Sequence, residues 1–266
     1  MKAMIESVQQ RYKQWNDALY NHYIEKFNAK TTIWDGVLFP EKYAKTSPKV
    51  MILNREAYDP EPDNSYDLCE AIQERIRIDD WVFPGQNTLR THLKQYLAVL
   101  NLLQKGSLGI SDDEVRECVQ STDYYDFIEN LNGVAYCNVK KSDGKPKSIK
   151  SDLFNYAKNS LDILKEQIRF FNPSIILAGN VCEGLLEDLL EWGDYLYIGP
   201  NRRICIWQLK IDGDCFPFVD MYHPSLAKGM SEYYLELFHA LQAVEKERPG
   251  FWNERIVKTK NCFITR

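Results

Sequence analysis

The chain has 266 residues, of which 44% are hydrophobic and 27% are charged, with a formal net charge of −5. This composition is ordinary for a globular protein and excludes a disordered or low-complexity chain. The acidic balance argues against a protein that coats nucleic acid, because such binding depends on many lysine and arginine contacts to phosphates. The length fits one large domain, so we expect residues 1–266 to fold as a single domain without linkers.

No stretch is apolar enough to resemble a membrane span, and the N-terminal residues mix charged with aromatic side chains, unlike a secretory signal. We therefore expect a cytoplasmic monomer that has no membrane partner. The seven cysteines include no close pair, which favours reduced thiols over disulfides or a metal site. We accordingly expect no metal and no other cofactor.

Helical and strand patterns alternate along the chain. Residues 1–30 predict a long helix on the outside of the domain, and residues 79–104 predict a loop followed by a helix. Apolar positions at helical spacing predict further helices over 153–171 and from Ser231, a natural N-cap. Short runs rich in β-branched or aromatic residues predict five buried strands, at 50–53, 133–139, 174–178, 204–209 and 216–221.

This alternation of elements predicts the fold class. Strands separated by helices of this length imply right-handed crossovers and a mostly parallel sheet that is covered on both faces. We therefore predict a three-layer α/β/α sandwich. The tail from Pro249 carries Phe251 and Trp252, so we expect it to fold back onto the domain.

Polar residues follow the first predicted strand, where the sequence reads NREAYD. Glu56 can position a water molecule and Tyr58 can wall off a small flat ligand. The alternative is a loop that leads into a helix and carries solvated charges.

The second predicted strand carries Asn138 near its end and is followed by a basic stretch. Residues 140–150 contain five lysines and one aspartate, a local net charge of +4. A side-chain amide can read the edge of a base, and lysines attract phosphates. The alternative is a solvated loop that begins with a turn asparagine.

The last predicted strand leads directly into Tyr222, His223, Pro224 and Ser225. Open α/β sheets build their sites beyond the carboxyl ends of their strands, which is where this imidazole is delivered. Pro224 fixes the backbone direction just after the histidine. The alternative is a histidine that is satisfied by backbone partners at the start of a loop.

Together these stretches resemble the uracil-DNA glycosylase superfamily. The similar motifs are NREAYD, AYCNVKK and YHPSLAKGM, with FNPSIILAGN between the last two, and they span residues 49–241 in the same order as in the family. The resemblance implies a uracil-DNA glycosylase-like fold with its site at the strand ends. It also implies a DNA-repair hydrolase that cleaves the N-glycosidic bond of uracil or another deaminated or damaged base.

The resemblance also implies a role for each matching residue. His223 would donate a hydrogen bond to the departing base, Glu56 would hold the attacking water, and Asn138 would recognise the base edge. The base would be flipped out of the duplex, and no metal would be needed. Further roles fall to Tyr58 (excluding a thymine methyl), Phe83 (stacking on the base), Ser225 (binding a phosphate), Leu226 (wedging into the duplex) and Lys140, Lys141 and Lys145 (contacting DNA).

The sequence departs from the family pattern in the first motif. Asn54 and Arg55 stand where the family has Gly and Gln, Glu56 replaces a shorter aspartate of one branch, and Ala57 replaces a proline. Positions that hold an iron–sulfur cluster in another branch match no cysteine here, which predicts no cluster.

Two other hypotheses remain open from the sequence. One is a binding module that keeps the fold but lacks the chemistry, and that takes modified DNA, a free base or a nucleotide. If Arg55 fills the space beside Glu56, this module is the better account. The other is a nucleotide-cofactor enzyme, which is disfavoured because no G-x-G-x-x-G or P-loop motif is present.

Overall fold

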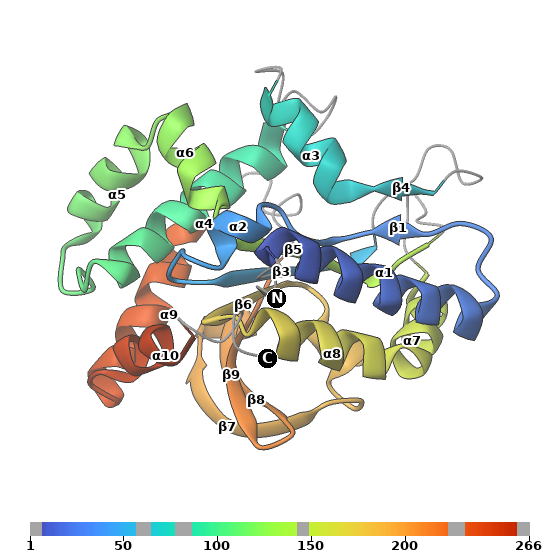
Figure 1. The fold of residues 1–266 in the computed structure, drawn as a ribbon. Helices are drawn as coiled ribbons and strands as arrows, with labels where there is room; N and C mark the ends of the chain where they lie inside the picture. The colour runs from blue at the N-terminus through green and yellow to red at the C-terminus, as the bar shows by residue number, and fades with distance from the viewer. Residues whose placement is uncertain (1–6, 57–64, 78–86, 143–148, 223–231, 260–266) are drawn as a thin grey trace, which may run out of the picture.

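A seven-stranded sheet forms the centre of the protein. The computed structural model describes residues 7–56, 65–77, 87–142, 149–222 and 232–259. The sheet has the order β2-β5-β3-β6-β9-β8-β7, and helices cover both of its faces (Figure 1). The predicted three-layer α/β/α sandwich is therefore confirmed. The strands of this sheet are β2 (Gly36–Val37), β3 (Val50–Glu56), β5 (Val134–Lys140), β6 (Ile175–Gly179), β7 (Glu191–Ile198), β8 (Ile204–Ile211) and β9 (Asp214–Met221).

The inner strands run parallel. β3 pairs in parallel with β5 and with β6, and β6 pairs in parallel with β9. β2 and β8 run antiparallel to their neighbours. A separate two-stranded sheet joins β1 (Ile33–Trp34) to β4 (Tyr66–Asp67).

All five predicted strands exist, but the last two are not connected by a crossover. β8 and β9 form an antiparallel hairpin whose tip is Asp212-Gly213. Both tip residues have positive φ angles, 48° and 85°, as the favoured two-residue hairpin turns require. This local turn explains the antiparallel strand within a mostly parallel sheet.

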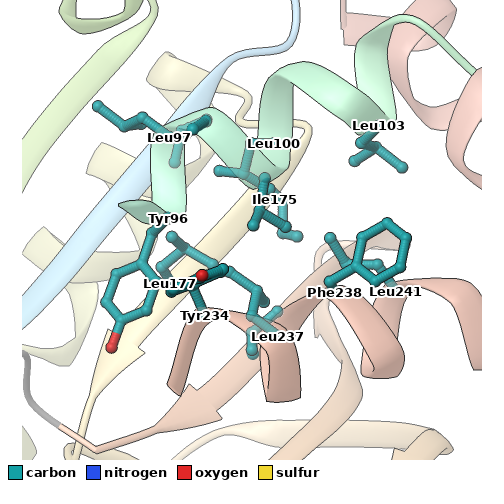
Figure 2. Close-up of a cluster of buried hydrophobic side chains, with 14 of the residues drawn as sticks. Tyr96, Leu97, Leu100, Leu103, Ile175, Leu177, Tyr234, Leu237, Phe238 and Leu241 are labelled. Atoms are coloured by element: carbon teal, nitrogen blue, oxygen red, sulfur yellow. The ribbon is translucent and has the colours of Figure 1, made fainter. Parts of the chain in front are cut away.

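One face of the sheet is covered by α4 (Asn87–Gln104), α9 (Tyr233–Glu247) and their neighbours. Figure 2 shows Leu100 and Leu103 of α4, Ile175 of β6, and Phe238 and Leu241 of α9 within one cluster. These side chains are almost completely buried, and each contributes roughly 1.5–3 kcal/mol through its removal from water. The same layer contains α3 (Leu68–Arg77), α5 (Asp112–Ser121), α6 (Tyr124–Leu131) and α10 (Phe251–Thr259).

The other face is covered by α1 (Val8–Phe27), α7 (Lys150–Asn159) and α8 (Leu161–Phe171), and the short α2 (Pro40–Tyr43) joins the same cluster. The sequence predicted one helix over 153–171, and this prediction is wrong. Ser160 separates α7 from α8, and its hydroxyl donates to the Tyr156 carbonyl at 2.6 Å. A side-chain bond of this kind competes with the regular helical ladder.

The other predicted helices are present, with one exception in where a helix begins. The predicted N-terminal helix is α1, the predicted helix within 79–104 is α4, and the tail folds back as α10, where Trp252 is buried. However, the N-cap of α9 is Glu232 and not the predicted Ser231, which lies outside the described residues. The assignment of the whole chain to one domain stays a prediction.

Two general predictions can be compared with the described part of the chain. No helix there is long and apolar enough to cross a bilayer. The six cysteines that the structure describes are all free, and four of them are buried.

Candidate functional site

The carboxyl ends of the parallel strands lie along one edge of the sheet, and β3 occupies a special position there. After β3 the chain passes to β5 on one side and later to β6 on the other. Connections that diverge in this way leave a crevice beyond the strand ends, which is where open α/β sheets bind their ligands. In this strand order the connections diverge between β3 and β6.

Two predicted site residues meet at this edge, on adjacent strands. Asn54 is in register with Asn138, and Glu56 is in register with Lys140. Because alternate residues of a strand share a face, Glu56 and Asn138 lie on the same face of the sheet. The side chains of both are buried, at 5% and 2% exposure.

Each of these two side chains has one unused hydrogen-bonding atom. Glu56 Oε1 and Asn138 Nδ2 are buried and have no hydrogen-bond partner among the described residues. A buried polar group without a partner costs about 1–3 kcal/mol, so such groups are uncommon unless a water or ligand completes them. The pair offers one acceptor and one donor on the same face of this sheet edge.

The second oxygen of Glu56 is held by Lys140. The Nζ to Oε2 distance is 3.6 Å, and both side chains are only 5% exposed. Lys140 Nζ also lies 4.8 Å from the centre of the Tyr156 ring, in a cation–π contact. The carboxylate therefore has one oxygen held by a positive charge and one oxygen that no described residue binds.

A buried aspartate anchors the backbone beside Asn138. Asp35 accepts a hydrogen bond from the Asn138 backbone N–H at 2.7 Å and pairs with Lys141 Nζ at 2.9 Å. Tyr20 Oη and Gln167 Nε2 also donate to Asp35, each at 3.0 Å. These bonds fix the end of β5.

The sequence placed Lys140 and Lys141 on an exposed basic stretch, and the structure corrects this. Strand β5 continues through Lys140, and both lysines are buried. They are paired with Glu56 and Asp35 because a buried charge is stable only with a partner of opposite sign. In this structure neither lysine is free to contact a phosphate on the surface.

Arg55 lies on the face opposite to Glu56, as strand alternation requires. Its Nε donates to the Asn180 carbonyl at 2.7 Å, and the Asn180 N–H donates to the Met221 carbonyl at 2.8 Å. These bonds connect the ends of β3, β6 and β9. Arg55 therefore does not fill the space beside Glu56.

Tyr136 adds a neutral hydroxyl to the face that carries Asn138. Burial raises the pKa of Tyr136 to about 12, because the low-polarity surroundings disfavour the phenolate, and the Asn54 amide beside it opposes this shift. At neutral pH Tyr136 is therefore protonated and can donate a hydrogen bond.

A cavity of about 300 Å³ lies farther along the same edge, beyond β6 and β9. Asp220 lines it, together with Cys182, Tyr195, Trp207 and Tyr222. Burial raises the pKa of Asp220 to about 7; the charges of Glu183 and Glu187 add to this effect, whereas the Cys182 N–H and Arg55 oppose it.

Sequence reasoning missed two residues of this edge, Asp35 and Asp220. Each stands as a single carboxylate inside an otherwise apolar run, IWDGVLF for Asp35 and FPFVDM for Asp220. A charge in such a run is the signal that could have identified them, because charged groups are rarely buried without a specific environment.

The structure therefore brings Glu56 and Asn138 together, but it does not describe every predicted residue. β9 ends at Met221, one residue before the exposed Tyr222 and two before His223 in the sequence. The predicted site residues that lie outside the described ranges are Tyr58, Phe83, Lys145, His223, Ser225 and Leu226.

Among the described residues, no group of three or more His, Cys, Asp and Glu side chains is arranged to hold a metal ion. Comparison with known proteins finds no family model that matches the chain and no curated protein that is significantly similar to it. The family resemblance of the strand-end motifs stays a prediction.

Proposed function

We propose that the protein hydrolyses the N-glycosidic bond of uracil, or of another deaminated or damaged base, in DNA. The observation that carries this proposal is the placement of Glu56 and Asn138 on one face of two adjacent strands, at the carboxyl edge of the sheet. Both side chains are buried on one face, and each keeps one hydrogen-bonding atom without a partner among the described residues.

The two free atoms suit the two requirements of the reaction. Cleavage leaves positive charge on the sugar and negative charge on the departing base, so the site must stabilise both and deliver a water. Glu56 Oε1 would hold the attacking water while Lys140 keeps the other oxygen in place. Asn138 Nδ2 would donate to a carbonyl oxygen of the base.

His223 completes the proposed mechanism. It follows β9 by two residues, and it would donate a hydrogen bond to the base oxygen as negative charge develops there. The base would have to leave the helical stack to reach this edge.

The Arg55 side chain points away from Glu56, which favours this proposal over a site that Arg55 has filled. Its guanidinium is bound to the Asn180 carbonyl on the opposite face, so the large residue at this family position leaves the Glu56 face open. The ion pair between Glu56 and Lys140 favours the second candidate, a binding module, because it restrains the carboxylate that must position water.

The test is an assay on labelled oligonucleotides that contain uracil, hypoxanthine or xanthine. We expect the wild-type protein to release one of these bases and leave alkali-sensitive sites. Glu56→Gln and His223→Ala should each act at least about 100-fold more slowly, the low end of what a positioned acid or base contributes. Asp17→Asn, a surface change on α1, is the matched control.

Three other outcomes of this assay would contradict the glycosylase proposal in part or in full. Equal cleavage by the wild type and His223→Ala would remove His223 from the mechanism. Base-dependent binding without cleavage would replace the enzyme with the binding module. A folded protein that neither cuts nor binds these oligonucleotides would contradict both.

A further inference from the structure

Asn54 on β3 lies next to the proposed site, although the family resemblance assigns no role to it. It is in register with Asn138 on the adjacent parallel strand, so the two amide side chains lie on the same face of the sheet. Asn54 is 4% exposed and Asn138 is 2% exposed. Two buried amides therefore stand side by side, one strand spacing or about 4.8 Å apart.

The nitrogen of each amide has no hydrogen-bond partner. Asn54 Nδ2 and Asn138 Nδ2 are both buried, and no described residue accepts from either. Burial raises the pKa of Tyr136 and the nearby Asn54 amide opposes this shift, but the contact does not complete a hydrogen bond at Nδ2. Unpaired buried donors are unfavourable, and here two of them lie on neighbouring strands. A ligand that both amides contact would remove this cost.

A second row of polar side chains lies two residues nearer to the strand ends. It consists of Glu56 in register with Lys140, and Glu56 Oε1 is also buried without a partner among the described residues. Two residues along a strand correspond to roughly 6.6 Å. This spacing is close to the span from a group that binds the outer edge of a pyrimidine to the sugar carbon. A base whose outer edge meets the two amides would therefore place its glycosidic bond beside Glu56.

We propose that Asn54 is a second base-contacting residue, which selects bases that carry a polar group on both sides of the ring nitrogen read by Asn138. This inference rests on the proposed function. Among deaminated bases, uracil and xanthine have a carbonyl oxygen on each side of a ring N–H, whereas hypoxanthine has a C–H on one side. With uracil, the Asn138 amide would pair with the ring N–H and one carbonyl, and Asn54 Nδ2 would donate to the other carbonyl.

This selection does not depend on which way either amide is turned. An amide can rotate to exchange its donor and its acceptor, so cytosine, with its amino group, would also satisfy both side chains. A C–H offers neither a donor nor an acceptor, and hypoxanthine would leave the Asn54 amide unpaired in a closed site. The two amides therefore distinguish bases by the number of polar groups at the edge, and they do not distinguish uracil from cytosine.

The experiment measures binding to single-stranded oligonucleotides that contain one uracil, one xanthine or one hypoxanthine. The full-length protein carries Glu56→Gln to suppress cleavage, and fluorescence anisotropy gives the Kd of each strand. We expect the uracil strand to bind about tenfold more tightly than the hypoxanthine strand, because one buried polar group is left unpaired in the second complex. The xanthine strand, which differs from the hypoxanthine strand by the second carbonyl group, should also bind more tightly than the hypoxanthine strand.

Asn54→Leu separates a role in binding from a role in folding. Leucine is similar in size but has no polar group, so the preference for the uracil strand should fall by about tenfold. The midpoint of urea unfolding should stay the same or rise, because a buried donor without a partner is removed. If Asn54→Leu does not fold, Asn54→Ala provides the same binding test with a smaller side chain.

The matched control is Asn16→Leu. Asn16 is another buried asparagine, and its Oδ1 has no partner among the described residues, but it lies on α1, which covers the other face of the sheet. This change should leave the preference for the uracil strand unaltered.

Four results would overturn the proposal. They are equal binding of the uracil and hypoxanthine strands, no saturable binding of any strand, a preference that survives the loss of the Asn54 amide, and a loss of stability in Asn54→Leu without a change in preference. Cleavage by the protein with Glu56 intact is scored separately, by release of the base. The glycosylase proposal can therefore stand when this one fails, and binding with the expected preference but without cleavage would keep the role of Asn54.

Discussion

The two polar regions at the carboxyl edge of the sheet differ in how their charges are compensated. Around β3 and β5, Asp35 and Glu56 are buried and each is paired with a lysine. Around β6 and β9, Asp220 borders a cavity with no ion-pair partner among the described residues, and burial raises its pKa to about 7.

This difference separates two ways of tolerating a carboxyl group inside a protein. A buried carboxylate keeps its charge when a lysine lies beside it, and the pair then holds the neighbouring backbone in place. A carboxyl group without such a partner becomes neutral more readily and gains a hydrogen-bond donor. The first arrangement gives rigidity, and the second gives a group that can change state near neutral pH.

The largest expected effect comes from breaking the innermost pair. Asp35→Asn leaves the charge of Lys141 buried without its counter-charge, which should lower the free energy of unfolding by about 3–5 kcal/mol. Urea unfolding measures this loss. Asp17→Asn is the control, because the exposed pair of Asp17 with Lys13 is worth at most about 1 kcal/mol. A loss below that value for Asp35→Asn would show that the pair does not anchor β5.

A smaller effect is expected at the Glu56 pair. Lys140→Met leaves the Glu56 carboxylate without its cation and should cost about 1.5–3 kcal/mol in the free energy of unfolding. The double variant Glu56→Gln/Lys140→Met should lose less than the sum of the two single changes, because the two side chains interact. Lys150→Met, on an exposed lysine, is the control. Additive losses would show that the 3.6 Å contact carries no energy.

A pH dependence at Asp220 gives the smallest expected change per step of the measurement, which here is one pH unit. Burial raises its pKa from 3.8 to about 7, so the folded protein binds this proton more tightly than the unfolded chain. The stabilisation is complete below about pH 4 and is lost as the pH rises through 7. Relative to Asp220→Asn, the wild type should lose stability by at most about 1.4 kcal/mol per pH unit within this window.

Urea unfolding of the wild type and Asp220→Asn at pH 5, 6, 7 and 8 measures this difference. Glu187→Gln removes a charge that raises the pKa of Asp220, so in that variant the loss should end at a lower pH and be smaller in total. A difference that stays constant from pH 5 to pH 8 would mean that Asp220 is charged throughout.

The sequence predicted most of the central sheet because its strands are continuous apolar runs. It missed β7, whose sequence EWGDYLYI is interrupted by a glycine and an aspartate, and which lies at the edge of the sheet that the structure describes. It also ended the second strand before Lys140, because lysine is normally a surface residue. Only the tertiary partners, Glu56 and Asp35, make buried lysines stable at those positions.

The candidate site was predictable only in part. Adjacent parallel strands must bring their carboxyl ends together, so the proximity of Glu56 and Asn138 follows from the strand order. The network of Asp35 does not, because its partners Asn138 and Gln167 are 103 and 132 residues away in the sequence. Local patterns carry no information about contacts at that separation.

The tip of the β8–β9 hairpin is a suitable position for attaching a label. Asp212 and Gly213 are exposed and stand at the end of β9 opposite to Met221. A fluorophore or a short peptide inserted there would therefore sit a full strand length away from both polar regions. The protein could be immobilised or labelled at this turn for the binding measurements while its strand ends remain accessible.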